Sequence, residues 1–178
     1  MNTNSPLHHR RSIRLRDYDY SQSGGYFITV VTNLRERLFE DIVNGEMRLN
    51  EFGGIVKNEW FKTRELRPNV ELFEEEFVVM PNHVHGIIWL IDDCRGTARR
   101  APTVEQFGVP VPGSIPTIIR SFKSAVTKQI NMLRQTAGTP VWQRNYYEHI
   151  INSDRDYDQI AEYIYTNPQN WKKDGEFI

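Results

Sequence analysis

The sequence predicts an α/β fold of the α+β kind, built on an antiparallel pair of strands. Residues 77–80 and 87–90 are short apolar runs typical of buried strands. Pro81 and Asn82 lie between them and favour a turn, because proline lacks an N–H donor and asparagine tolerates turn geometry. Amphipathic patterns add the helices, which we expect at 50–64, 115–133 and 153–167.

The first half of the chain supplies most of the predicted sheet. We expect residues 1–12 to be a disordered, basic N-terminus. Residues 26–32, rich in β-branched and aromatic side chains, form a strand, and the dipeptide Asn44-Gly45 favours a small hairpin within 39–49. Asn50 offers an N-cap for the first helix, whose apolar stripe includes Phe52, Val56 and Trp60. Residues 70–80 then return as a strand.

The second half begins with a loop and ends with a helix. Residues 92–114 lack a periodic pattern and are expected to be a long loop. The next helix has the apolar face Ile118, Ile119, Phe122, Val126, Ile130 and Leu133. Residues 140–151 predict a fourth core strand with a loop before it. Ser153 caps the last helix, and Pro168 is expected to end it, because the residue before proline disfavours helical geometry.

Charge is informative by its distribution and not by its sum. The chain has 178 residues, about one domain, with 22 Lys and Arg against 23 Asp and Glu. Two tracts, residues 1–16 and 106–147, carry basic residues and no Asp or Glu. Tracts of this kind suit binding to a phosphate backbone. An ordinary solvated face is the alternative for each tract. The candidate DNA-contacting residues are Arg10, Arg11, Arg14, Arg16, Arg120, Lys123, Lys128 and Arg144.

The sequence also predicts the compartment. Cys94 is the single cysteine, so no disulfide can form within the chain. The Arg-rich start lacks the apolar core of a secretory signal, and no apolar run is long enough to span a membrane. We therefore expect a soluble, cytoplasmic protein without a membrane partner.

Two histidines at the start of a strand form a candidate metal site. His83 and His85 point to the same face, because side chains alternate along a strand. Two imidazoles are half of a metal site, although such a pair can also be bonded to backbone carbonyls. His149 is open to two interpretations, as a third ligand or as a strand residue facing partly into the core.

The last helix presents a candidate reactive tyrosine. Tyr163 lies off the apolar stripe Tyr157, Ile160, Ala161 and Ile164, and shares a helix side with Asn167, four residues later. The alternative is a partly buried tyrosine with a solvated hydroxyl. Tyr165 is the rival nucleophile, on the opposite flank of the stripe.

These residues together resemble a known family. Residues 81–85 (Pro-Asn-His-Val-His), the arginine-rich start and residues 163–168 (Tyr-Ile-Tyr-Thr-Asn-Pro) are similar to the single-tyrosine HUH transposases of the IS200 type, and most of all to the REP-associated tyrosine transposases. The resemblance runs from about Arg10 to Trp171. It implies one catalytic domain over residues 13–178 and a ferredoxin-like sandwich, with packed helices on an antiparallel sheet of about four core strands.

The resemblance also implies a chemistry. Tyr163 matches the nucleophile, His83 and His85 match the metal-binding pair, and Asn167 stands where the family has its third ligand, often a glutamine. Such a set suits Mg²⁺ or Mn²⁺. The enzyme would be a metal-dependent endonuclease and strand transferase that forms a 5′-phosphotyrosine on single-stranded or hairpin DNA, with repetitive palindromic elements as the expected target and a monomer or homodimer as the expected state.

Two other functions remain open from the sequence. One is a DNA-hairpin-binding module of transposase descent that has lost catalysis. Retention of Tyr163, His83 and His85 favours the enzyme, because a pure binder has no need of all three. The other is a structural metal site, which two evident ligands support poorly.

Overall fold

The computed structural model describes residues 18–39, 42–43, 46–92 and 111–171. The expected disorder of residues 1–12, the four N-terminal arginines and most of the loop 92–114 lie outside these ranges. The order of the elements is β1 (Gly24–Val31), η1 (Asn33–Arg35), β2 (Ile42–Val43), β3 (Glu46–Met47), α1 (Glu51–Leu66), β4 (Val70–Glu71), η2 (Glu74–Glu76), β5 (Phe77–Met80), β6 (His83–Leu90), α2 (Ile115–Leu133), β7 (Tyr147–Ile151) and α3 (Asp154–Asn170).

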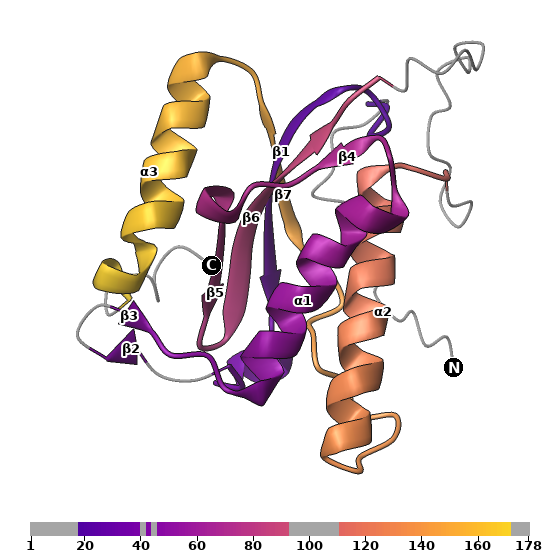
Figure 1. Cartoon of the computed structure of the whole chain (residues 1–178), viewed down its shortest axis with the longest axis vertical. Helices are drawn as coiled ribbons and strands as arrows, with labels where there is room; N and C mark the ends of the chain where they lie inside the picture. Colours follow the sequence, from indigo (N-terminus) through magenta and orange to yellow (C-terminus); the bar gives the residue numbers. More distant parts are fainter. Residues whose placement is uncertain (1–17, 40–41, 44–45, 93–110, 172–178) are drawn as a thin grey trace, which may run out of the picture.

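A five-stranded antiparallel sheet forms the middle layer, and helices cover both of its faces (Figure 1). The strand order is β4-β6-β1-β7, and β5 also pairs with β6. Helices α1 and α2 lie on one face, and α3 lies on the other. The predicted α+β fold with an antiparallel sheet is therefore confirmed.

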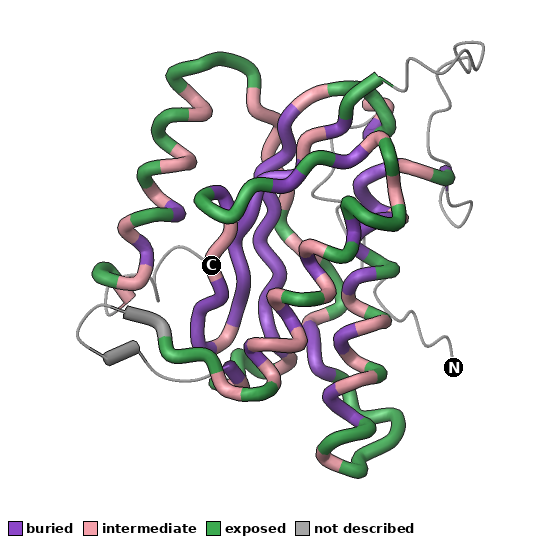
Figure 2. Tube along the Cα trace, in the orientation of Figure 1, coloured by how far each residue is buried: buried purple, intermediate pink, exposed green. Residues whose placement is uncertain are grey.

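The two faces of the sheet differ in how much they bury. The central strands are buried along most of their length (Figure 2). The larger core lies under α1 and α2, where Trp60 packs so tightly on β6 that a Cβ at Gly86 would come within 2.5 Å of the indole. A much smaller cluster, centred on Phe27, Ile87 and Ile164, joins α3 to the sheet. Polar side chains therefore have room on the α3 face.

The predicted hairpin and its register are present. Residues of β5 and β6 pair antiparallel from Met80 with His83 to Phe77 with Gly86. Strand β1 pairs with β6 so that Thr29 lies opposite His85 and Val31 lies opposite His83. The small β2–β3 hairpin is also confirmed, although its turn lies outside the described residues.

Helices α1 and α2 match their predictions closely. Asn50 caps α1 by accepting a hydrogen bond from the N–H of Gly53. The predicted apolar face of α2 is buried from Ile118 to Ile130, whereas Leu133 is 47% exposed at the last turn.

Three expectations about element bounds were wrong. Residues 70–80 are not one strand, because η2 separates β4 from β5. The strand expected over 140–151 is interrupted: Trp142 forms an isolated antiparallel bridge with Thr32, the carbonyls of residues 143–145 accept hydrogen bonds from Lys123 on α2, and β7 begins at Tyr147. Helix α3 continues through Pro168 to Asn170, and its last turns are packed against the sheet by the buried Asn167 and by Trp171, which stacks on His83.

Candidate active site

The site lies between the start of β6 and the second half of α3. His83 and His85 stand on the face of the sheet that α3 covers, and both are buried, with exposed fractions of 2% and 1%. Their Nε2 atoms are 2.9 Å apart. The predicted same-face placement of the two imidazoles is confirmed.

Hydrogen bonds fix the orientation of each ring. His83 Nδ1 lies 2.7 Å from Asn82 Oδ1, which can only accept, so this nitrogen carries a proton. His85 Nδ1 lies 2.8 Å from the hydroxyl of Thr29 on β1. When both Nδ1 atoms donate, the two Nε2 lone pairs of the neutral rings converge on one point.

Tyr163 of α3 completes the group from the other side. Its hydroxyl oxygen lies 3.2 Å from His85 Nε2, and its ring meets Phe27 edge to face. Tyr163 thus has packing contacts that the sequence did not predict, in addition to its place beside the histidines. Tyr165, by contrast, is 76% exposed.

Asn167 lies on the same face of α3, one turn after Tyr163. One further turn along, the ring of Trp171 stacks on His83 at a centroid distance of 5.8 Å. Because Tyr163 meets His85 and Trp171 meets His83, Asn167 is placed between these contacts. Its side chain is 1% exposed, and neither amide atom has a hydrogen-bond partner. A buried amide without partners is costly, which is typical of a group that awaits a ligand.

The residues fit a divalent cation of the expected kind. Two nitrogens that bind one cation at about 2.1 Å and at a right angle lie about 3 Å apart, close to the separation of the two Nε2 atoms. Among the described residues no group of three His, Cys, Asp or Glu side chains could hold a metal. Asn167 offers a buried amide as a candidate third protein ligand.

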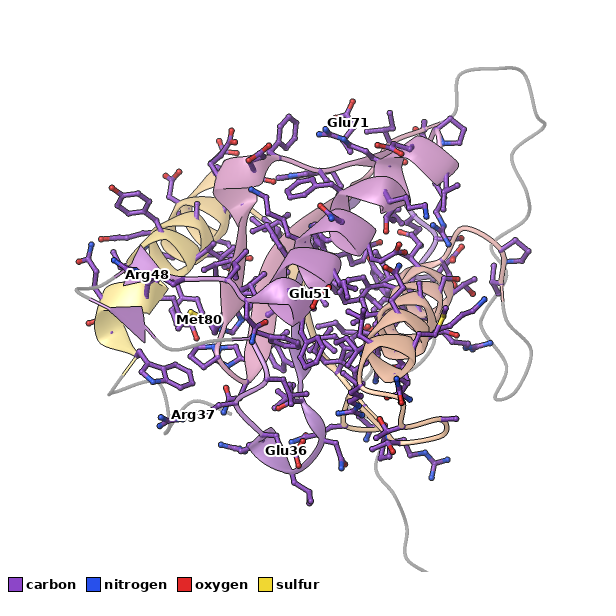
Figure 3. The ribbon with its side chains drawn as sticks, turned by 60° about the horizontal axis from the view of Figure 1, so that its bottom comes forward. Glu36, Arg37, Arg48, Glu51, Glu71 and Met80 are labelled. Carbon is purple, nitrogen blue, oxygen red and sulfur yellow. The ribbon has the colours of Figure 1, made fainter. Side chains whose placement is uncertain are left out.

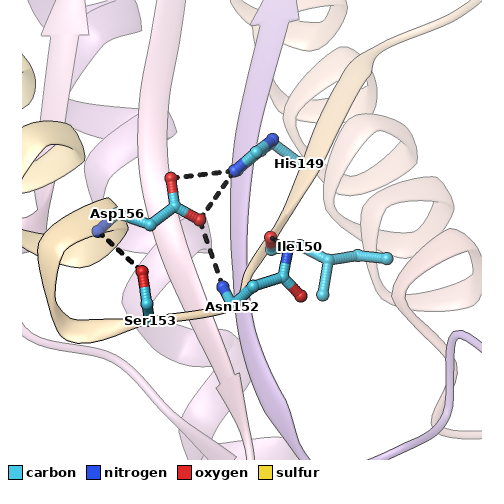
Figure 4. Close-up of polar contacts among 5 residues, drawn as sticks. All are labelled: His149, Ile150, Asn152, Ser153 and Asp156. Atoms are coloured by element: carbon cyan, nitrogen blue, oxygen red, sulfur yellow. Dashed lines mark hydrogen bonds and ion pairs between the residues drawn. The ribbon is translucent and has the colours of Figure 1, made fainter.

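His149 does not join this group. It lies on β7 opposite Phe27 and is half-buried. Its Nε2 contacts both carboxylate oxygens of Asp156 at 2.9 and 3.0 Å, as Figure 4 shows. This contact and the N–H of Asn152 hold the pKa of Asp156 below its usual value. Of the two interpretations of His149, the structure favours the partly buried strand residue.

The basic residues of α2 border a cleft on the opposite face of the sheet. The cleft has a volume of about 840 Å³ and lies between α2 and the segment 137–144, with Lys128 and Arg144 exposed at its rim and no acidic residue in its lining. Arg120 is exposed further along α2. Lys123 is half-buried and donates hydrogen bonds to the carbonyls of Gln143, Arg144 and Asn145, and burial lowers its pKa to about 8.

Sequence reasoning missed four residues at the site. Thr29 and Asn82 orient the histidines, Trp171 stacks on His83, and Arg37 lies over the indole of Trp171. Asn82 was detectable, because it directly precedes His83 in the motif. Thr29 could not be found from the sequence, because nothing about a threonine in a strand indicates which residue lies opposite it on the neighbouring strand.

None of the helices in the described part of the chain has the length and apolar character needed to span a membrane.

Two Haemophilus influenzae proteins are similar in sequence to this chain over most of its length. No protein-family model matches the sequence. A Haemophilus influenzae protein of uncharacterised function is 41% identical over 178 residues, covering 98% of this chain and 97% of the relative. A second H. influenzae protein, named as a candidate REP-associated tyrosine transposase, is 28% identical over 153 residues, covering 84% of this chain and 73% of the relative.

The fold has a solved counterpart. It is similar to the structure of a REP-associated tyrosine transposase bound to a REP hairpin, with a TM-score of 0.60 and 23% sequence identity over 89% of this chain and 73% of that one. The chain therefore belongs to one family with its 41%-identical relative, and its resemblance to the REP-associated tyrosine transposases, which the motifs predicted, is confirmed.

Proposed function

We propose that the protein is a divalent-cation-dependent DNA endonuclease and strand transferase that cuts single-stranded or hairpin DNA through Tyr163. One observation carries the proposal. The Tyr163 hydroxyl lies 3.2 Å from His85 Nε2, which lies 2.9 Å from His83 Nε2, and a buried, unpartnered Asn167 amide stands on the same helix face. Nucleophile and metal ligands are thus assembled from β6 and α3.

The step at Tyr163 exchanges one phosphate ester for another. The phenolic oxygen attacks the scissile phosphorus, the bond from phosphorus to the 3′ oxygen breaks, and Tyr163 becomes joined to the 5′ phosphate. The hydroxyl loses its proton and the leaving 3′ oxygen gains one, so no net proton is released. Because the ester bond is conserved, attack by a 3′ hydroxyl reverses the step and joins strands without a nucleotide cofactor.

His83, His85 and Asn167 would hold Mg²⁺ or Mn²⁺. When bound, the cation neutralises the charge on the phosphate oxygens and favours the phenolate form of tyrosine. The chain's own contribution is orientation. Asn82 and Thr29 fix the two imidazoles, and the Tyr163 ring is held edge to face by Phe27.

The proposed DNA substrate rests on the structure of similar fold and on the basic residues of this chain. The solved structure of similar fold is described as bound to a REP hairpin, and we propose that the present chain also acts on the hairpin DNA of repetitive palindromic elements. Arg120, Lys128, Arg144 and the four N-terminal arginines are the proposed phosphate contacts, because cations supply the sequence-independent part of DNA binding.

The test is capture of the covalent link. The protein is incubated with end-labelled hairpin DNA and Mn²⁺ and then denatured, and the adduct is resolved as a slower band. We expect an adduct with the natural chain, none with Tyr163→Phe, and an undiminished one with Tyr165→Phe. The Tyr165 variant is the matched control, since it removes the same atom from an exposed ring two residues away.

Two outcomes would overturn parts of the proposal. An adduct that persists in Tyr163→Phe and disappears in Tyr165→Phe would identify the other tyrosine as the nucleophile. Tight hairpin binding without any adduct, in Mg²⁺ or Mn²⁺, would favour the alternative of a catalytically silent hairpin-binding module.

A further inference from the structure

An aromatic and cationic stack stands at the edge of the site, outside the set of groups that the chemistry uses. The Trp171 ring lies on His83 with an interplanar angle of 26°, and the guanidinium carbon of Arg37 lies 5.7 Å from the centre of the Trp171 ring. The two residues come from opposite ends of the described chain. Figure 3 shows Arg37 at the edge of the molecule, near Met80 at the end of β5.

The accessibility of the stack increases outward. His83 is 2% exposed, Trp171 is half-buried and Arg37 is exposed. The backbone holds Arg37 in place, because the N–H groups of Leu38 and Phe39 both donate to the carbonyl of Pro81 in the β5–β6 turn. The indole therefore lies between the buried imidazole of His83 and the solvent, and the segment that carries Arg37 is fixed to the turn that carries the histidine motif.

Packing in the two hydrophobic clusters does not account for the stack of Arg37, Trp171 and His83. Trp171 belongs to neither buried cluster of the described chain. Aromatic side chains that reach the solvent are the usual platforms for unpaired nucleobases, because every base has a π face that stacks on an aromatic ring, and arginine adds a cation–π contribution. A planar guanidinium over an indole occupies the kind of position that a base would take.

We propose that Trp171 is the stacking platform for the nucleobase that flanks the scissile phosphate, and that Arg37 contacts the backbone of the same nucleotide. The inference rests on the proposed function, because it takes the phosphate at the histidine pair as its reference point. Since the Trp171 and His83 rings are in contact, the stacked base belongs to the nucleotide at the cut or to its neighbour. The base takes the place of the guanidinium on the ring, and Arg37 moves to the phosphate.

The platform would give affinity and register without reading a base code. Stacking tolerates all four bases, whereas hydrogen bonds to base edges distinguish them. Trp171 thereby positions the strand so that the phosphate next to the stacked base lies at Tyr163 and the histidines. Sequence choice would come from other contacts.

The test measures binding of hairpin oligonucleotides in a Tyr163→Phe background, which cannot cut. The oligonucleotides carry either all bases or one abasic site, placed in turn at each nucleotide around the cut. We expect Trp171→Ala to weaken binding of the complete oligonucleotide about 5- to 150-fold, the range for one base stacked on an aromatic ring. Trp171→Phe keeps an aromatic ring and should lose less.

The deciding measurement is whether the loss of binding caused by Trp171→Ala and the loss caused by an abasic site are additive. At one position next to the cut, an abasic site should weaken binding to the Tyr163→Phe protein and cause no further loss in the Trp171→Ala protein. An abasic site several nucleotides away is the control and should affect both proteins equally. Quenching of indole emission on binding should also disappear with Trp171→Phe.

The outcomes separate this inference from the proposed function. If Trp171→Ala weakens complete and abasic oligonucleotides by the same factor at every position, Trp171 acts only in packing and the inference is wrong, whether or not the covalent adduct forms. If the natural chain forms no adduct yet the losses fail to add at one position, the platform stands and the proposed cleavage is wrong.

Discussion

The hydroxyl of Tyr157 on α3 donates a hydrogen bond to Oε1 of Glu76, 81 residues earlier in the chain, at 2.9 Å. The other carboxylate oxygen, Oε2, accepts from the indole N–H of Trp89 on β6 at 2.7 Å. Glu76 is 4% exposed. This buried carboxyl joins the helix that carries Tyr163 to the strand that carries the histidines, on a face where the apolar core is small.

Removal of the Tyr157 hydroxyl should loosen this connection. We expect Tyr157→Phe to lower the free energy of unfolding by about 1–2 kcal/mol, because it leaves a buried carboxylate oxygen without its donor. Urea denaturation followed by circular dichroism measures the change. Tyr165→Phe, which alters an exposed ring on the same helix, should unfold as the natural chain does. Equal stability of both variants would show that the bond contributes little.

The same carboxyl should make stability depend on pH. Burial raises the pKa of Glu76 above its usual value, and the hydrogen bonds from Trp89 and Tyr157 only partly oppose this. Since the folded chain holds the proton more tightly than the unfolded chain, the stabilisation is complete below the unfolded pKa and is lost as pH rises through the folded pKa. Glu76→Gln cannot titrate, so its stability relative to the natural chain should increase with pH across that interval. Urea denaturation of both proteins at a series of pH values measures this. A constant difference would contradict the assigned shift.

The amide of Asn167 should cost stability and provide metal affinity. In a chelating buffer, Asn167→Leu should raise the free energy of unfolding by about 1–2 kcal/mol, because it replaces a buried amide that has no partners. The same variant should bind Mn²⁺ more weakly by calorimetry. Asn170→Ala, at an exposed position on the same helix, is the control. A loss of stability in the chelating buffer would indicate that the amide has partners within the fold.

The histidine pair should be required for cation binding and not for folding. We expect the double variant His83→Ala and His85→Ala to lose Mn²⁺ binding in calorimetry and the covalent DNA adduct, while its circular dichroism spectrum stays the same. Metal-dependent cleavage at an undiminished rate in the double variant would remove these side chains from the chemistry.

Lys128 and Arg144 should contribute to DNA binding, whereas Lys123 should contribute to the stability of the fold. Lys128→Gln and Arg144→Gln should each weaken hairpin binding. Each should also reduce the slope of log K against log salt concentration by about one unit, because one fewer counterion is released from the DNA when the protein binds. Lys123→Gln should instead destabilise the fold, since its ammonium holds three backbone carbonyls. Lys57→Gln on α1 is the control for a surface charge. An unchanged salt slope for both Lys128 and Arg144 would make the cleft an ordinary solvated surface.

The sequence by itself determined the elements and the order of the reactive groups. Strand alternation placed His83 and His85 on one face, and helical spacing placed Tyr163 and Asn167 on one side of α3. The Asn50 and Ser153 caps were readable for the same reason, because each depends on atoms only a few residues apart. Such local geometry is fixed by the backbone period and needs no knowledge of the rest of the chain.

Tertiary structure decided what these groups meet. The Thr29 hydroxyl on His85, the Glu76 carboxyl under Tyr157 and the indole of Trp171 on His83 each join residues that are 56, 81 and 88 positions apart, and no periodic pattern records such contacts. The same holds for the errors. The carbonyls of residues 143–145 accept hydrogen bonds from Lys123 on α2, and α3 runs beyond Pro168 to the point where Trp171 stacks on His83. Both departures lie where the chain meets a distant segment, and local propensity is a weak preference that tertiary contacts override.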